Sequence, residues 1–206
     1  MIPDDFFDRF STPKYRARDP LKRWLIRRFM ERLVGMFERA GPARSVLEVG
    51  VGEGFVSGYL SGVFPAARFA GVDTNREDLD RLRALFPRIE AREGSIHDLG
   101  FLGTSFDVVL CVQVLEHVGD PSGALDEIAR LGPRRAIVTV PHEPFFRLSN
   151  LARGRNLGRL GDDPGHLHHW GAKAFRKLLA RRFDVVELGT SFPFLLASVA
   201  PHNRPR

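Results

Sequence analysis

The chain is poor in the features that mark exported or membrane-spanning proteins. It has one cysteine, Cys111, among 206 residues, which excludes an intrachain disulfide. It has no run of the roughly 20 apolar residues that a membrane-spanning helix needs, and its acidic start, Met1–Asp5, lacks the charge pattern of a secretory signal. We therefore expect a cytoplasmic protein, with Cys111 buried inside the apolar run 108–112.

Internal repeats and low-complexity tracts are also missing, and this favours one ordinary globular domain. With 43% hydrophobic residues, the chain has enough apolar material for a sizeable core. The net charge of +6 is unevenly spread, because residues 9–39 hold ten Lys or Arg against three acids, an excess of seven. The basic character thus belongs to an N-terminal arm rather than to a surface built for nucleic acid.

Residues 1–40 are expected to form that arm and one amphipathic helix. The segment before Pro20 looks irregular, and apolar residues then recur at helical spacing until Gly41-Pro42, a helix-breaking pair. They are Leu21, Trp24, Leu25, Phe29, Leu33 and Phe37. The favoured interpretation is a helix docked on the core or over the active site. The alternative is contact of residues 20–39 with a membrane surface or an anionic partner.

Residues 41–206 alternate short apolar runs with helical stretches, which predicts a parallel sheet covered by helices. Strands are expected at 45–49, 69–72, near Ile89, 106–112 and 136–140, and helices at 54–63, 76–85, 122–131 and 172–181. Two successive apolar runs, 183–188 and 192–199, predict an antiparallel pair at the sheet edge. The expected fold is a single Rossmann-like α/β domain with a mostly parallel seven-stranded sheet. The long irregular stretch 141–170 predicts a lid or substrate loop.

Closely spaced glycines follow the first of these strands. The segment 46–54 reads VLEVGVGEG, and it leads directly into a predicted helix. Glycines allow a tight turn and remove side chains that would block a ligand from the backbone. A dinucleotide-binding fingerprint would place its third glycine where Phe55 stands, so NAD binding is disfavoured.

An acidic residue, Asp73, ends the second predicted strand. A carboxylate there can accept hydrogen bonds from the two hydroxyls of a ribose. Taken alone, Asp73 is equally well explained as the N-cap of the next helix. Its combination with the glycine turn favours the nucleoside interpretation.

At this point the chain resembles the class I S-adenosylmethionine-dependent methyltransferases, of the kind that act in ubiquinone, natural-product and sugar O-methylation. The resemblance covers about residues 45–199 and rests on 47–54 (LEVGVGEG), 71–73 (GVD), 94–99 (GSIHDL) and 106–118 (FDVVLCVQVLEHV). It implies S-adenosylmethionine as cofactor. The cofactor-binding residues that it implies are Glu48, Gly50, Gly52, Gly54, Asp73, Thr74, Ser95, Ile96, Cys111, Val112 and Gln113.

Methyl transfer to a hydroxyl requires that the acceptor lose a proton, and histidine has a suitable pKa for this task. Four residues follow predicted strands or close the long loop, where ligands of parallel sheets bind. They are the catalytic candidates His142, His117, Glu116 and His166. His97 and His202 are equally well explained as surface or capping residues.

The segment 113–117 (QVLEH) is similar to the Glu-x-x-Glu-His element that holds a divalent cation in ubiquinone-pathway and small-RNA 3'-end methyltransferases. That likeness implies a metal site of Glu116, His117 and His166, with Mg²⁺ favoured, in which Gln113 replaces a carboxylate.

The predicted function is O-methylation of a sugar, an oligosaccharide or another small metabolite by an enzyme that uses S-adenosylmethionine. Trp170, Phe145 and Phe146 would stack on the acceptor ring. A phenolic acceptor, an RNA 2'-hydroxyl and a non-catalytic nucleotide-binding module remain as alternatives. Nucleic acid is disfavoured, because the cations of segment 145–160 have no aromatic residues interleaved among them of the kind that stack unpaired bases. Those cations are Arg147, Arg153, Arg155 and Arg159.

Overall fold

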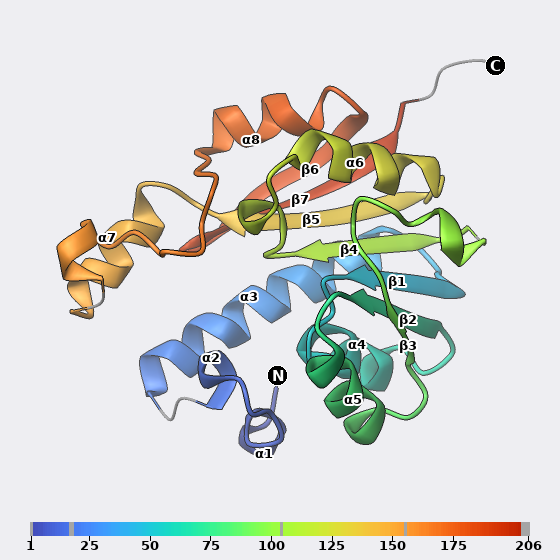
Figure 1. Cartoon of the computed structure of the whole chain (residues 1–206), viewed down its shortest axis with the longest axis horizontal. Helices are drawn as coiled ribbons and strands as arrows, with labels where there is room; N and C mark the ends of the chain where they lie inside the picture. The colour runs from blue at the N-terminus through green and yellow to red at the C-terminus, as the bar shows by residue number, and fades with distance from the viewer. Residues whose placement is uncertain (1, 17–18, 104, 155, 203–206) are drawn as a thin grey trace.

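The computed structural model describes residues 2–16, 19–103, 105–154 and 156–202, although the side chains at 13 and 14 are outside that description. Seven strands form one sheet in the order β3-β2-β1-β4-β5-β7-β6 (Figure 1). The strands are β1 Ser45–Val49, β2 Arg68–Asp73, β3 Glu90–Glu93, β4 Val108–Val112, β5 Arg135–Pro141, β6 Phe183–Ser191 and β7 Phe194–Pro201. The first five are parallel, and β7 runs antiparallel to β5 and β6. This confirms the predicted Rossmann-like fold.

Helices cover both faces of the sheet. They are α1 Asp4–Phe7, α2 Pro13–Arg16, α3 Pro20–Arg39, α4 Phe55–Val63, α5 Arg76–Leu85, α6 Pro121–Arg130, α7 Phe145–Ala152 and α8 Ala172–Leu179, with the 3₁₀ turns η1 Gly100–Leu102, η2 Leu115–His117 and η3 Leu157–Arg159. In Figure 1, α3, α4 and α5 lie on one face and α6 and α8 on the other. The two apolar clusters of the core separate in the same way.

The central strand β4 shows why both faces must be covered. Val108 and Leu110 belong to the cluster with α3 and α4, whereas Val109 and Cys111 belong to the cluster with α6 and α8. All four side chains are fully buried. Because successive side chains of a strand point to opposite faces, an uninterrupted apolar strand requires helices on each side.

The expectation of an irregular segment before Pro20 was wrong. Residues 4–7 and 13–16 form α1 and α2, and Phe6, Phe7 and Phe10 are buried in the same cluster as Phe55. Four-residue helices are too short to show periodicity in sequence. Contacts with the rest of the chain therefore decide their structure.

Helix α3 is docked on the sheet, as the favoured interpretation held. Asp19 caps it by accepting hydrogen bonds from the backbone N–H groups of Leu21 and Lys22, at 2.9 and 3.3 Å. Leu33 and Met36 are completely buried, whereas Leu21 and Trp24 are more than half exposed. Within the described part of the chain, no helix has the length and apolar character needed to cross a membrane.

The stretch 141–170 is more regular than predicted, because it contains α7 and the turn η3. Figure 1 shows α7 extending from the sheet beyond the ends of β5 and β7. Ser149 and Asn150 are buried on its inner side, but Phe145 and Leu148 remain about half exposed. The apolar residues of this eight-residue helix are exposed or half-buried while polar ones are buried, so the stretch did not stand out as a core-facing helix in the sequence.

Candidate functional site

The turn between β1 and α4 needs its glycines for different reasons. Gly50, Gly52 and Gly54 all have positive φ, at +73°, +51° and +83°, which side-chain-bearing residues rarely adopt. A Cβ on Gly50 would lie 2.3 Å from Val114, and one on Gly54 would lie 2.2 Å from Leu82. A Cβ on Gly52 would meet none of the described atoms within 4 Å. Gly52 therefore leaves open space beside a bare backbone, the feature a ligand-binding turn requires.

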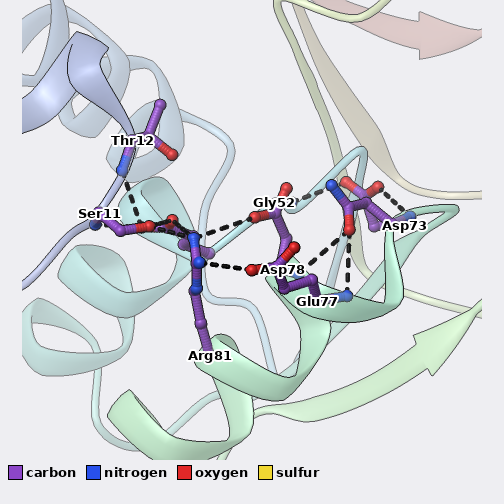
Figure 2. A network of polar contacts seen from close by, with 9 residues as sticks. Ser11, Thr12, Gly52, Asp73, Glu77, Asp78 and Arg81 are labelled. Atoms are coloured by element: carbon purple, nitrogen blue, oxygen red, sulfur yellow. Dashed lines mark hydrogen bonds and ion pairs between the residues drawn. The ribbon is translucent and has the colours of Figure 1, made fainter.

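Asp73 lies beside this turn, at the end of β2. One carboxylate oxygen accepts a hydrogen bond from the Gly52 N–H at 2.8 Å, and the other accepts one from the Asn75 N–H at 2.9 Å (Figure 2). These bonds fix the orientation of the carboxylate. Each oxygen keeps a second lone pair with which it can accept a hydrogen bond from a ribose hydroxyl. The helix cap that follows is Asn75, not Asp73.

Glu48 lies in β1, two residues before Gly50. Its side chain is buried, and one oxygen accepts hydrogen bonds from the backbone N–H and the hydroxyl of Ser57, at 2.9 and 2.5 Å. Burial raises the pKa of Glu48 to about 7, against the partly compensating bonds from Ser57. The residue thus joins the end of β1 to the first turn of α4.

A second acidic residue of the turn, Glu53, connects it to the N-terminal arm. Its carboxylate accepts hydrogen bonds from the Ser11 hydroxyl, from the Ser11 N–H at 2.8 Å and from Arg81 at 2.9 Å. Burial disfavours its charge, but the bonds from Ser11 and Arg81 outweigh that effect and hold the pKa of Glu53 below its usual value. Figure 2 shows Ser11 from the arm and Arg81 from α5 lying side by side. The sequence analysis missed this network.

The remaining predicted cofactor residues differ in accessibility. Thr74 is exposed, Ser95 is half-buried and Ile96 is 7% exposed. Cys111 is completely buried among the residues facing α6 and α8, and this burial raises the pKa of its thiol. Its side chain therefore belongs to the core, and only its backbone is available for contact with a cofactor. Val112 and Gln113 are half-buried.

Two cavities lie next to Gln113. The small cavity is lined by Tyr15, Phe55, Val112 and Gln113, and the Tyr15 and Phe55 rings stack with centroids 3.8 Å apart. The large cavity has a volume of about 330 Å³ and shares Ile26, Gln113 and Phe194 with the small one. Its wall comes from five segments, namely α3, the turn after β4, α7, the loop after η3 and the β6–β7 hairpin.

The large cavity contains three of the predicted catalytic residues, Glu116, His117 and His166. One possible ligand atom from each lies within 4.8 Å of the others. His117 makes a 2.8 Å hydrogen bond through Nδ1 to the carbonyl of Gly165, and its ring lies 5.0 Å from that of His166. Burial lowers the pKa of His166 to about 4, so its imidazole is neutral at pH 7. Among the described residues, its buried Nδ1 has no hydrogen-bond partner.

The fourth predicted catalytic residue, His142, is not among the residues that line either cavity. It begins the segment after β5, where its ring packs at 4.8 Å against Phe145, and burial lowers its pKa. Of the aromatic residues expected to stack on an acceptor, Phe146 lines the large cavity. Phe145 contacts Phe192 instead, and Trp170 stacks on His168.

Another acidic cluster, of Glu143, Asp162 and His169, has atoms close enough to hold a metal ion. Arg147 occupies it, however, with its guanidinium 3.3 Å from Asp162 and 3.8 Å from Glu143. Asp162 also accepts a 2.6 Å hydrogen bond from His169. The cluster is therefore an ion-pair network that holds the loop against α7.

Several residues of the large cavity were missed by the sequence analysis. They are Lys22, Leu25, Asn150, Arg153, Asp163 and Phe194. Leu25 was predicted to lie on the apolar face of its helix. The spacing of apolar residues is the same whether that face packs on the core or lines a cavity, so the sequence could not distinguish the two. The polar members come from segments that only the folded chain brings together.

Comparison with known proteins agrees with this geometry. Residues 47–137 match the family model described as a methyltransferase domain. A probable S-adenosylmethionine-dependent methyltransferase of Mycolicibacterium smegmatis is 35% identical over 88 residues, covering 43% of this chain and 34% of the relative. A ubiquinone biosynthesis O-methyltransferase of Paracidovorax citrulli is 35% identical over 94 residues, covering 43% of this chain and 39% of the relative. The matched segments thus span less than half of either relative.

Among solved structures, magnesium protoporphyrin IX methyltransferase from Synechocystis PCC 6803 with bound S-adenosylhomocysteine superposes with a TM-score of 0.70. The sequence identity is 20%, and the superposition covers 96% of this chain and 97% of the other. At that identity the likeness shows a common fold. Because it covers 96% of the chain, the superposition extends well beyond the segment matched by the family model.

Proposed function

We propose that this chain, which carries a class I S-adenosylmethionine-dependent methyltransferase domain, transfers the methyl group of that cofactor to a hydroxyl of a small acceptor. A sugar or an oligosaccharide unit is the first candidate acceptor, and a phenolic metabolite is the second. The observation that carries the proposal is the large cavity, which contains Glu116, His117 and His166 and shares Gln113 with the small cavity, whose lining includes Phe55, next to the glycine turn.

The residues around the turn suit S-adenosylmethionine. Gly52 leaves open space at its Cα, and Asp73 offers lone pairs at a fixed orientation for the ribose hydroxyls. The half-buried Ser95 and the apolar Ile96 follow β3 and would border the adenine. S-adenosylmethionine supplies a methyl group already activated by a positive sulfur, so the protein must align the acceptor and manage its proton.

The large cavity suits a compact acceptor. Its volume of about 330 Å³ is at the lower end of the range for small-molecule sites, roughly 300–1,000 Å³. Phe146 and Phe194 offer apolar walls to the face of a sugar or a phenol ring. The neutral imidazole of His166 and the neighbouring His117 are the groups that would accept a hydrogen bond, or a proton, from the acceptor hydroxyl.

The same three side chains would also hold a divalent cation. The fit is supported by the 4.8 Å grouping of their ligand atoms and by the buried His166 Nδ1. Such an ion would lower the pKa of the acceptor hydroxyl. One carboxylate and two imidazoles suit Mn²⁺ or Zn²⁺ better than the Mg²⁺ expected from sequence, because Mg²⁺ prefers oxygen ligands.

Two experiments test the proposal. Titration calorimetry should show binding of S-adenosylmethionine to the full chain, and absence of binding would overturn the enzyme assignment. Transfer of a labelled methyl group should then be measured to panels of sugars, phenols and RNA, with and without a chelator. Labelling of RNA but of no small hydroxyl compound would overturn the choice of acceptor. Activity that survives the chelator would overturn the cation.

A further inference from the structure

Gln113 occupies the boundary between the two cavities. It directly follows β4 and lines both the small cavity, beside Val112 and Phe55, and the large cavity, beside Glu116 and His117. The small cavity reaches Phe55, which directly follows the glycine turn, so under the proposed function a side chain at this boundary would lie between the cofactor and the acceptor.

The backbone at Gln113 is in a conformation that its side chain disfavours. Its φ is +58°, in the left-handed region where non-glycine residues are strained. Such strain persists only where the surroundings over-determine the conformation. The other described non-glycine residues with positive φ, Asn156 and Leu160, belong to the loop around η3, whereas Gln113 directly follows β4, the middle strand of the sheet.

Thr139 supplies the contacts that hold Gln113. The Gln113 N–H is shared between the Thr139 carbonyl at 3.1 Å and the Thr139 hydroxyl at 3.2 Å. The side-chain amide nitrogen of Gln113 donates to the same hydroxyl at 3.1 Å. Thr139 is in the middle of the neighbouring strand β5, paired with Val112, and is completely buried. Its hydroxyl therefore accepts from both the backbone and the side chain of Gln113.

This arrangement decides which part of the Gln113 amide is offered to a ligand. The amide nitrogen donates one of its two N–H groups to Thr139, which fixes the amide and leaves the oxygen Oε1 as the acceptor that it can offer to a ligand at the boundary. An amide oxygen carries partial negative charge, and the methyl hydrogens of a sulfonium carry partial positive charge. The two attract each other through weak C–H···O contacts.

We propose that Thr139 is a positioning residue that fixes Gln113 so that Oε1 contacts the sulfonium methyl group at the boundary of the two cavities. The inference rests on the proposed function, since it requires that S-adenosylmethionine bind at the glycine turn. It assigns a role to Thr139 and makes Gln113 a group that distinguishes the methylated cofactor from its product. A purely structural Thr139 would support both forms of the cofactor equally.

S-adenosylmethionine and S-adenosylhomocysteine differ only in the methyl group and the positive charge on sulfur, so the ratio of their dissociation constants isolates the contact. Calorimetry on the full chain gives this ratio without knowledge of the acceptor. Thr139→Val removes the hydroxyl at nearly constant volume, and Thr139→Ser retains it. Ser198→Ala is the matched control, because Ser198 is a buried hydroxyl on the adjacent strand β7.

In Thr139→Val the affinity for S-adenosylmethionine relative to S-adenosylhomocysteine is expected to fall about threefold, the size of one weak C–H···O contact. Thr139→Ser and Ser198→Ala should leave it at the wild-type value. Gln113→Leu, which removes the amide oxygen itself, should shift the ratio at least as far and serves if Thr139→Val fails to fold.

Equal weakening of both ligands in Thr139→Val and Gln113→Leu, or no change in either, would overturn the inference while leaving the proposed function intact. A wild-type chain that binds neither compound would overturn both. The two failures are therefore distinguishable by the first titration.

Discussion

Replacing Glu48 by glutamine tests the electrostatics beneath the glycine turn. Burial raises the pKa of Glu48 from its ordinary value of 4.5 to about 7. In the unfolded chain the group ionises near pH 4.5, whereas in the folded chain it keeps its proton until about pH 7. Between these pH values the unfolded chain releases the proton and the folded chain still holds it. Rising pH therefore stabilises the unfolded state relative to the folded state, and the wild-type protein loses stability. The difference between the two pKa values corresponds to about 3 kcal/mol.

Glu48→Gln cannot ionise, so its stability should not carry this loss. The glutamine oxygen can still accept the two hydrogen bonds from Ser57, and the cost of its buried amide nitrogen is the same at every pH. Urea unfolding at pH 4.5 and pH 8 gives the free energy of unfolding of both proteins. Between these pH values the stability of the wild type, relative to the variant, should fall by about 3 kcal/mol.

The matched control is Glu31→Gln, which removes the same charge from an exposed position on α3. It should leave the pH dependence of the wild type nearly unchanged, because an exposed carboxylate is solvated in both states. If Glu48→Gln and the wild type differ by the same free energy at pH 4.5 and pH 8, then Glu48 is not held protonated by burial. The interpretation of the turn given above would then be wrong.

Three further predictions concern the turn, the arm and the large cavity. Gly52→Ala should weaken S-adenosylmethionine binding at least about tenfold in calorimetry. Its stability cost should be only about 1–2 kcal/mol, for the left-handed backbone. The control Gly62→Ala, on the exposed side of α4, should leave the affinity unchanged. Phe10→Ala should lower the free energy of unfolding in urea by about 3–5 kcal/mol, because Phe10 is 1% exposed and packs on Phe55. A loss below about 1 kcal/mol would show that the arm is not part of the core. His117→Ala should lower kcat for the acceptor found by screening at least about tenfold while the Kd of S-adenosylmethionine stays constant, and equal losses in both would remove His117 from the catalytic set.

The sequence was most informative where one local rule acts alone. The strand 45–49 and the helix 76–85 have the predicted bounds, because a short apolar run and helical spacing are local signals, and in the structure Asn75 caps the helix at its predicted start. The placement of Gly52 beside Asp73 also follows from order along the chain, since the ends of adjacent parallel strands meet at one sheet edge.

Prediction failed where long-range contacts determine local structure. Helices α1 and α2 have four residues each, and phenylalanines buried by distant parts of the chain hold α1 in place. Helix α7 buries polar residues, and its Asn150 donates a hydrogen bond to the carbonyl of Gly161, eleven residues away. None of these helices has a long apolar stripe that is buried against the sheet, which is the pattern by which the longer helices were predicted.

The same distinction separates the two halves of the candidate site. Sequence alone determined the arrangement of the proposed cofactor side, because a strand, a glycine turn and an acid at the next strand end are local features with a fixed spatial relation in a parallel sheet. Only the tertiary structure decided the acceptor side, where α3, α7 and the β6–β7 hairpin close around Glu116, His117 and His166, and where His142 lies outside the cavity wall. These side chains meet through packing between distant segments, which no short stretch of sequence encodes.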